Sequence, residues 1–299
     1  MEYHREVIPL KMGRDFYKKA QIQIANLRER KPEMREVLDF CETLFKEQEK
    51  TNSSFSFNSN GLDINSYKDR NARGVPLLTA EDININWILF DTLIQRIGEL
   101  VTRRVKNSFP QSVSFITQNE EELHKSLVQG VMKEEPNLER LASQYEMDYN
   151  LFVFLIHQAF TPFMEKYAEK LGEYNERNLW LKGYCPICGR EPLMAKFEKE
   201  TGKRLLQCCL CRTEWVFRRI ECPFCSNREQ NYLRFFFVED DELHRVDVCD
   251  KCKKYIKTVN LRDREEDSVL FIEYVTTIHL DRLAQKEGFL ETEIGLLGV

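Results

Sequence analysis

The sequence predicts an α+β multidomain protein, in which an N-terminal α-helical domain precedes two small metal-binding domains with four cysteines each. Two observations lead to this class. Apolar residues recur at helical spacing through the first part of the chain. Four Cys-x-x-Cys pairs then punctuate short strand-like segments. We expect the helical domain at residues 1–177, the metal domains at 178–219 and 220–265, and a C-terminal helical segment at 266–299.

Length and composition fit a folded chain of this kind. The 299 residues allow two or three domains, and a hydrophobic content of 42% is enough for a sizeable core. The net charge of -5 argues against binding to a nucleic-acid backbone. Residues 181–257 nevertheless contain 16 Lys and Arg against 12 Asp and Glu. This local excess suits either a solvated surface of mixed charge or contact with an acidic partner.

No targeting or membrane segment is apparent in the sequence. The first twenty residues contain no apolar core of a secretory signal. The longest apolar-rich run, Leu151 to Phe163, is too short to span a bilayer. We therefore expect a soluble, cytoplasmic protein without membrane insertion. In a reducing compartment, paired cysteines favour metal binding or redox chemistry over disulfides.

The helical domain is expected to contain several amphipathic helices. Residues 13–48 read as two helices separated by Pro32, and residues 51–74 as a polar loop. Thr79 and Asp82 have capping-box spacing and predict a helix over 80–105. Asn119 is a candidate cap for the next helix, and Pro136 begins another.

The run over residues 151–171 reads as the most buried helix, bent or broken near Pro162. We expect His157 within it to be a core residue. The helical domain contains no glycine-rich phosphate loop, no His-Glu-x-x-His and no nucleophile elbow, so the sequence offers no catalytic residues. We therefore expect a protein that is not an enzyme.

Strand composition appears only in the second half of the chain, at residues 205–208, 214–217 and 233–238. Residues 268–289 return to a helical pattern, with Gly288 as a plausible C-terminal stop.

The cysteine spacing predicts two metal ions, each held by four thiolates. Two residues between cysteines form a tight turn that directs both sulfurs at one ion. Pro186 and Gly189 supply the dihedral angles that such a turn needs. The gaps between successive pairs are 19 and 23 residues, close to zinc-ribbon spacing. The predicted metal ligands are Cys185, Cys188, Cys208 and Cys211 for one ion, and Cys222, Cys225, Cys249 and Cys252 for the other.

Some features of these sites stay open. A cross-braced arrangement would instead join the first pair with the third and the second with the fourth. Zinc and iron both accept four thiolates, so the spacing does not choose between them. A closed four-thiolate site has no free position for substrate and is usually structural. The other two cysteines, Cys41 and Cys209, read as small packing residues.

The cysteine motifs and their flanks resemble the FdhE family of formate dehydrogenase accessory proteins. The resemblance covers residues 183–192, 204–215, 219–225 and 249–257, in family order. A weaker likeness covers Gly74 to Leu78, and residues after Gly288 do not match. The resemblance implies an N-terminal helical domain followed by two rubredoxin-like, zinc-ribbon-type metal domains.

The resemblance also implies a function. The protein would be a cytoplasmic, non-enzymatic assembly chaperone that binds the formate dehydrogenase catalytic subunit before twin-arginine export, with the eight paired cysteines involved in metal binding and client contact. Two alternatives are a zinc-ribbon protein that binds nucleic acid, and a thiol redox protein that uses Cys-x-x-Cys as a dithiol. The sequence leaves the oligomeric state open, a homodimer included.

Overall fold

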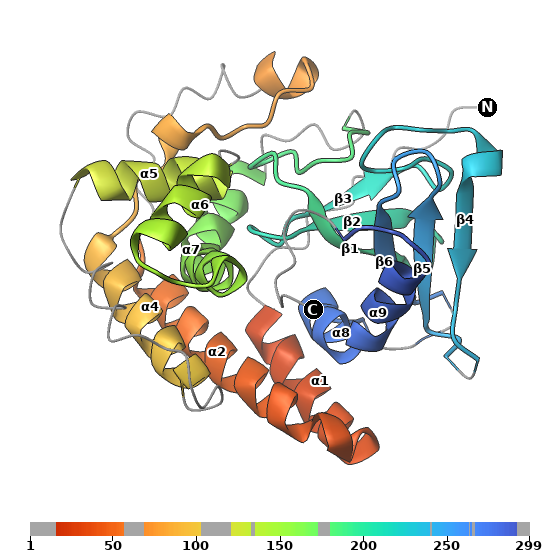
Figure 1. Cartoon of the computed structure of the whole chain (residues 1–299), viewed down its shortest axis with the longest axis horizontal. Helices are drawn as coiled ribbons and strands as arrows, with labels where there is room; N and C mark the ends of the chain where they lie inside the picture. The colour runs from red at the N-terminus through yellow and green to blue at the C-terminus, as the bar shows by residue number, and fades with distance from the viewer. Residues whose placement is uncertain are drawn as a thin grey trace.

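The computed structural model describes residues 16–56, 69–102, 121–132, 135–172, 180–239, 241–262, 264 and 267–291. Helices from the first part of the chain form one side of the molecule, and a sheet with the last two helices forms the other (Figure 1). This confirms the α+β class. Among the described helices, none combines the length and apolarity needed to cross a membrane.

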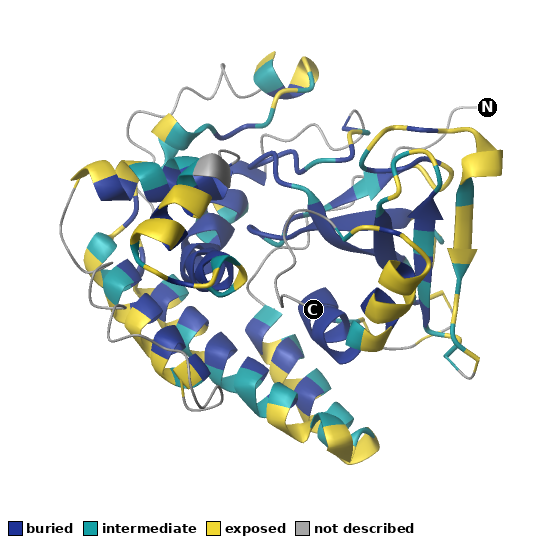
Figure 2. Ribbon diagram, viewed as in Figure 1, coloured by how far each residue is buried: buried dark blue, intermediate teal, exposed yellow. Residues whose placement is uncertain are grey.

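The helical part is built around one central helix. Its members are α1 (Phe16–Arg30), the short turn η1 (Pro32–Met34), α2 (Arg35–Ser54), α4 (Trp87–Thr102), α5 (Glu121–Met132), α6 (Glu135–Gln144) and α7 (Tyr149–Leu171). Helix α7 contacts α2, α4, α5 and α6, and it is buried continuously from Phe152 to Glu165 (Figure 2). The expected separation of the first two helices at Pro32 is confirmed.

The sequence predicted that the helix over residues 151–171 is bent or broken near Pro162. Helix α7 continues through Pro162, so it is not broken there. Proline has no N–H, so the carbonyl of Gln158, four residues earlier, loses its helical donor. The side chain of Gln48 on α2 replaces that donor, with Nε2 2.8 Å from the Gln158 oxygen. The buried carbonyl is thereby satisfied, and packing against α2 keeps the helix intact.

The prediction of a helix start at residue 80 is wrong. Thr79 and Asp82 do form the expected capping box, but it closes only the short turn η2 (Ala80–Asp82). Residues 83–86 are not helical, and α4 begins at Trp87. The hydroxyl of Tyr167 accepts from Asn84 N at 2.7 Å and donates to Asn84 O at 2.9 Å, so a contact with α7 fixes this segment outside the helix. The Asn119 cap lies outside the described residues.

Six strands form one sheet in the order β3-β2-β1-β6-β5-β4 (Figure 1). They are β1 (Pro192–Phe197), β2 (Arg204–Cys208), β3 (Glu214–Phe217), β4 (Leu233–Phe236), β5 (His244–Cys249) and β6 (Tyr255–Asn260). All neighbours are antiparallel except β1 and β6, which pair in parallel from Ala195 opposite Thr258 to Phe197 opposite Asn260. Two three-stranded units are thus joined by one parallel contact. We call them the first unit (β1–β3) and the second unit (β4–β6).

The last two helices cover one face of this sheet. Helix α8 (Leu270–Thr276) contacts β1, β6 and α2, and α9 (Ile278–Lys286) contacts β5. The predicted C-terminal helix is therefore two helices, interrupted at Thr277, and Gly288 lies just beyond its end with φ of 84°. One large apolar core runs through the helical part, the first unit and α8. The second unit has a smaller core of its own beneath α9.

Candidate metal centres

The first cluster lies where the first unit meets the helical part. Cys185 and Cys188 flank one turn, and Cys208 and Cys211 flank another at the end of β2. Gly189 and Arg212, which follow the two turns, have φ of 73° and 55°. Backbone N–H groups of Ile187 and Leu210 lie 3.4 Å from the sulfurs of Cys185 and Cys208, respectively. Such donors favour thiolates over thiols.

The four sulfurs of this first cluster are close enough to share an ion. Cys188 Sγ lies 3.4 Å from Cys208 Sγ, and Cys185 Sγ lies 3.5 Å from Cys211 Sγ. A tetrahedral ion with metal–sulfur bonds of about 2.3 Å holds its ligands roughly 3.8 Å apart. All four side chains are buried. The first cluster is therefore a compact, closed site.

Protonation in the first cluster is uneven. Burial raises the pKa of the Cys185, Cys188 and Cys211 thiols well above the ordinary value. Burial also opposes ionisation of Cys208, but hydrogen bonds from the neighbouring thiols lower its pKa well below that value. Joint ionisation of the four buried cysteines is thus unfavourable without a cation, whereas a bound cation would stabilise four thiolates and release protons as it binds.

The second cluster has the same layout in a more open setting. Cys222 Sγ lies 3.7 Å from Cys252 Sγ, and Cys225 Sγ lies 3.7 Å from Cys249 Sγ. The residues after its two turns, Ser226 and Lys253, have φ of 56° and 58°. Here Cys225 is exposed and Cys252 is half-buried. The second cluster could therefore hold an ion, but solvent reaches it.

Neighbouring pairs come together in both clusters, and all sulfurs within each group lie within 4.8 Å of one another. The cross-braced arrangement is not the one the structure adopts. Each group offers four thiolates and is able to hold one metal ion; the donor set suits zinc or iron alike.

The remaining residues singled out from the sequence lie apart from these clusters or serve packing. Cys41 is buried in α2. Cys209 is buried beside Cys208, and its backbone N–H donates to Glu191 O at 3.2 Å. His157 is buried in α7, and burial lowers its pKa to about 3, so it is a neutral core residue.

Three contacts that position the clusters were not apparent from the sequence. Backbone N–H groups of Leu77 and Leu78 donate to the carbonyls of Pro186 and Ile187, at 3.0 and 2.8 Å. Gly183 packs so closely on the segment that joins the two units that a Cβ there would lie 1.7 Å from Pro223 O. Both segments, residues 74–78 and 183–192, had been singled out by their resemblance to the family, but the resemblance did not indicate these contacts.

A third contact links the first cluster to the helical part. Arg212, which directly follows Cys211, forms an ion pair with Glu165 on α7. Its guanidinium also lies over the ring of Phe16 at 4.0 Å. The position of the first cluster is therefore set by side chains far away in the sequence.

Comparisons with known proteins agree with this architecture. The model of the FdhE central domain matches residues 184–219, which hold the first cluster. The chain is 27% identical to the Protein FdhE homolog of Aquifex aeolicus over 281 residues, covering 92% of this chain and 93% of that one. It is 28% identical to Protein FdhE of Escherichia coli O157:H7 over 125 residues, covering 41% of this chain and 38% of that one.

A solved structure shows the same fold. The crystal structure of the FdhE protein from Pseudomonas aeruginosa superposes with a TM-score of 0.67 at 20% identity, covering 97% of this chain and 98% of the other. Its likeness extends over the helical part as well as the sheet, whereas the domain model matches only the first cluster. Together these comparisons show that the chain is similar to FdhE proteins in its first cluster, over most of its sequence and in its fold.

Proposed function

We propose that this chain is a cytoplasmic accessory protein for formate dehydrogenase, which binds the catalytic subunit before its export by the twin-arginine route and catalyses no reaction itself. The similarity to FdhE proteins supports this role, since the resemblance in the cysteine motifs points to formate dehydrogenase maturation. The observation that carries the proposal is the pair of four-cysteine clusters at the ends of strands of one sheet, of which the first belongs to the core shared with the helical domain.

The proposal assigns one zinc or iron ion to each cluster. The eight paired cysteines are the ligands, and the predicted boundaries at residues 177, 219 and 265 separate the helical domain, the two metal domains and the C-terminal segment. Four thiolates fill a tetrahedral coordination sphere, which leaves no open position for a substrate. The ions would thus shape a protein surface rather than activate a small molecule.

Metal analysis distinguishes this proposal from the alternative of a thiol redox protein. Protein purified without oxygen should contain two metal ions per chain, identified by element-specific mass spectrometry. Sulfurs gathered in groups of four favour a cation over a dithiol–disulfide couple, which needs only two. A metal-free protein that exchanges disulfides rapidly would instead support the redox alternative.

Client binding is tested by capture of the formate dehydrogenase catalytic subunit. Wild type should capture the subunit, and a Cys225→Ser, Cys252→Ser variant should capture less if the ion of the second cluster shapes the contact. The matching Cys185→Ser, Cys188→Ser variant tests the first cluster. The control is Cys209→Ser, which keeps all eight paired cysteines.

Circular dichroism of each variant separates loss of client contact from loss of folding. This check matters most for the first cluster, because its cysteines belong to the large core. Equal capture by wild type and by folded, metal-free variants would remove the metal clusters from client binding. Failure of wild type to capture the subunit would refute the proposed role as a whole.

A further inference from the structure

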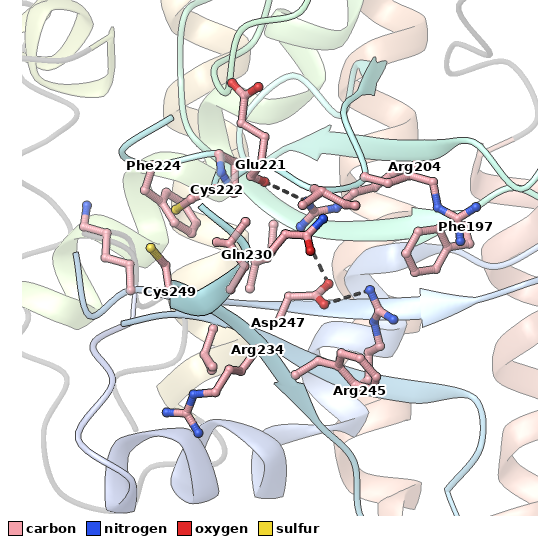
Figure 3. Close-up of a pocket in the computed structure, with 18 residues that line it drawn as sticks. Phe197, Arg204, Glu221, Cys222, Phe224, Gln230, Arg234, Arg245, Asp247 and Cys249 are labelled. Carbon is pink, nitrogen blue, oxygen red and sulfur yellow. Dashed lines mark hydrogen bonds and ion pairs between the residues drawn. The ribbon is translucent and has the colours of Figure 1, made fainter. Parts of the chain in front are cut away.

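A pocket of about 680 Å³ lies where the two units meet in the sheet (Figure 3). Strands of both units form its floor, and the segment from Arg219 to Phe224 that joins the units lines it as well. Cys222 and Cys249 of the second cluster line one end. The pocket therefore exists only because the two units share one sheet.

The other end of the pocket carries an excess of positive charge. Arg204, Arg219 and Arg245 line it, and Asp247 lies between Arg204 and Arg245 (Figure 3). Arg204 and Arg245 share the carboxylate of Asp247, which lies 3.6 Å from Arg204 and 2.8 Å from Arg245. Among the described residues, no carboxylate forms an ion pair with Arg219. The other lining carboxylate, Glu221, pairs with Arg218 and Arg228.

Arg204 is buried with part of its hydrogen-bonding capacity unused. Its side chain is only 3% exposed, and Nη1 donates to the carbonyl of Glu221 at 3.0 Å. Nε and Nη2, however, have no hydrogen-bond partner among the described residues. The nearby Asp247 oxygen accepts instead from Thr258 Oγ1 at 2.5 Å. Unused donors on a buried cation are costly, so an oxygen anion from outside fits this end of the pocket.

The pocket also has an apolar side, which a small anion would leave uncovered. The guanidinium of Arg245 lies between the rings of Phe197 and Phe235, with its carbon 4.6 Å from each ring centre. Phe235 is nevertheless 54% exposed, and Ile220, which also lines the pocket, is 53% exposed. Phe237, two residues further along the edge of the sheet, is 64% exposed. Large apolar side chains grouped around cations are typical of protein interaction sites.

We propose that this pocket binds an acidic, extended segment of a partner protein, whose carboxylates meet Arg204, Arg219 and Arg245 while its apolar side chains cover Phe235 and Ile220. The inference deepens the proposed function, because it names the kind of client segment that the second unit recognises. Charge complementarity selects the segment, since the three guanidiniums face a single carboxylate of the chain itself. The apolar rim explains why the ligand is a peptide rather than free phosphate.

The test uses the full-length, metal-loaded protein and two labelled octapeptides. One alternates valine with glutamate, and the other alternates valine with glutamine. In fluorescence anisotropy the glutamate peptide should bind at least tenfold more tightly, and added salt should narrow the difference. Arg219→Gln and Arg245→Gln should each weaken binding about tenfold. Arg282→Gln, an exposed change on α9, is the matched control and should change nothing.

Three results would overturn the proposal: equal affinity for the two peptides, no loss of affinity in the arginine variants, or binding of inorganic phosphate to these arginines with no binding of the glutamate peptide. Metal content is measured in every variant, so that loss of the second cluster is not mistaken for loss of the pocket. If wild type does not capture the catalytic subunit but binds the glutamate peptide as expected, the proposed function is wrong and the pocket remains a binding site for an acidic segment. If capture succeeds and Arg245→Gln leaves it unchanged, the pocket is not the client site.

Discussion

Arg212 and Glu165 form a buried ion pair, with Nη1 2.6 Å from Oε1, which joins the first cluster to the central helix α7. Tyr17 donates a hydrogen bond to the other carboxylate oxygen of Glu165 at 2.7 Å, and Arg212 donates to Gln48 at 2.8 Å. Helices α1, α2 and α7 thus converge on the residue that follows Cys211. Removing either charge would leave its partner buried without compensation.

The first prediction concerns this ion pair. Glu165→Gln should lower the free energy of unfolding by about 3 kcal/mol, because the Arg212 charge then stays buried without its partner. Urea denaturation of metal-loaded protein measures the loss. The control is Glu169→Gln on the same helix, where a half-buried pair with Lys166 at 3.4 Å should contribute at most about 1 kcal/mol. Equal losses in the two variants would contradict a special role for Glu165.

The second prediction is that the two clusters release metal at different rates. Cys225 is exposed and Cys252 half-buried, whereas all four cysteines of the first cluster are buried. A chelator should therefore remove one ion quickly and the other only as the protein unfolds. Release followed with a coloured metal indicator should show two phases of equal amplitude. Cys225→Ser should abolish the fast phase alone, and a single phase in wild type would argue against the asymmetry.

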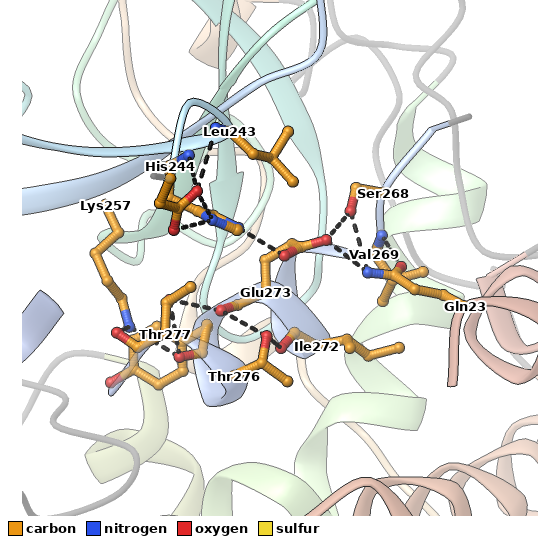
Figure 4. A network of polar contacts seen from close by, with 12 residues as sticks. Gln23, Leu243, His244, Lys257, Ser268, Val269, Ile272, Glu273, Thr276 and Thr277 are labelled. Carbon is orange, nitrogen blue, oxygen red and sulfur yellow. Dashed lines mark hydrogen bonds and ion pairs between the residues drawn. The ribbon is translucent and has the colours of Figure 1, made fainter. Parts of the chain in front are cut away.

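The third prediction concerns pH and the buried His244, whose ring contacts Asp241 at 2.9 Å and Glu273 at 2.7 Å (Figure 4). Burial opposes the charged ring, but hydrogen bonds and charge from these carboxylates raise the pKa of His244 above its usual range. The imidazolium in turn lowers the pKa of Asp241 and Glu273, against the effect of their burial.

The sign of the pH effect follows from these shifts. The contribution of His244 to the free energy of unfolding is fully present below the pKa of histidine in the unfolded chain, about 6.5. It disappears as the pH rises through the raised pKa of His244 in the folded protein. The contributions of Asp241 and Glu273 are present above about pH 4.5 and disappear as the pH falls through their lowered pKa values in the folded protein. The difference in unfolding free energy between wild type and His244→Gln should therefore be largest between about pH 4.5 and 6.5 and decline above that range. A constant difference from pH 6 to 9 would show that the ring is neutral.

The fourth prediction tests the join between the two units. Gly183→Ala places a methyl group where Pro223 O lies 1.7 Å away, so the backbone at Gly183 or at Pro223 must move. The expected loss of stability is about 1–3 kcal/mol, as for overpacking elsewhere. Gly202→Ala is the control, because its Cβ would meet nothing nearer than 3.6 Å and only its φ of 61° is unfavourable. The variants are compared by urea denaturation at full metal occupancy.

Much of the local structure could be predicted from spacing. Apolar periodicity located α1, α2 and α7, since a helix repeats its contacts every three to four residues. Strand composition located β2 and β3, and the start of β4. The capping box at Thr79 shows the limit of such signals: it formed as expected, yet the chain leaves the helix again because Asn84 bonds to Tyr167 on a distant helix.

Local sequence predicted most of the helices, strands β2 and β3, and the four tight turns that aim paired sulfurs at a common point, because these depend on residues near one another in the chain. Tertiary structure alone decided the parallel contact of β1 with β6, the unequal exposure of the two clusters and the pocket that gathers Arg204, Arg219 and Arg245. Each of these depends on segments that are far apart in sequence and meet only when the core forms. The spacing of residues within one segment does not predict which surfaces will then face each other.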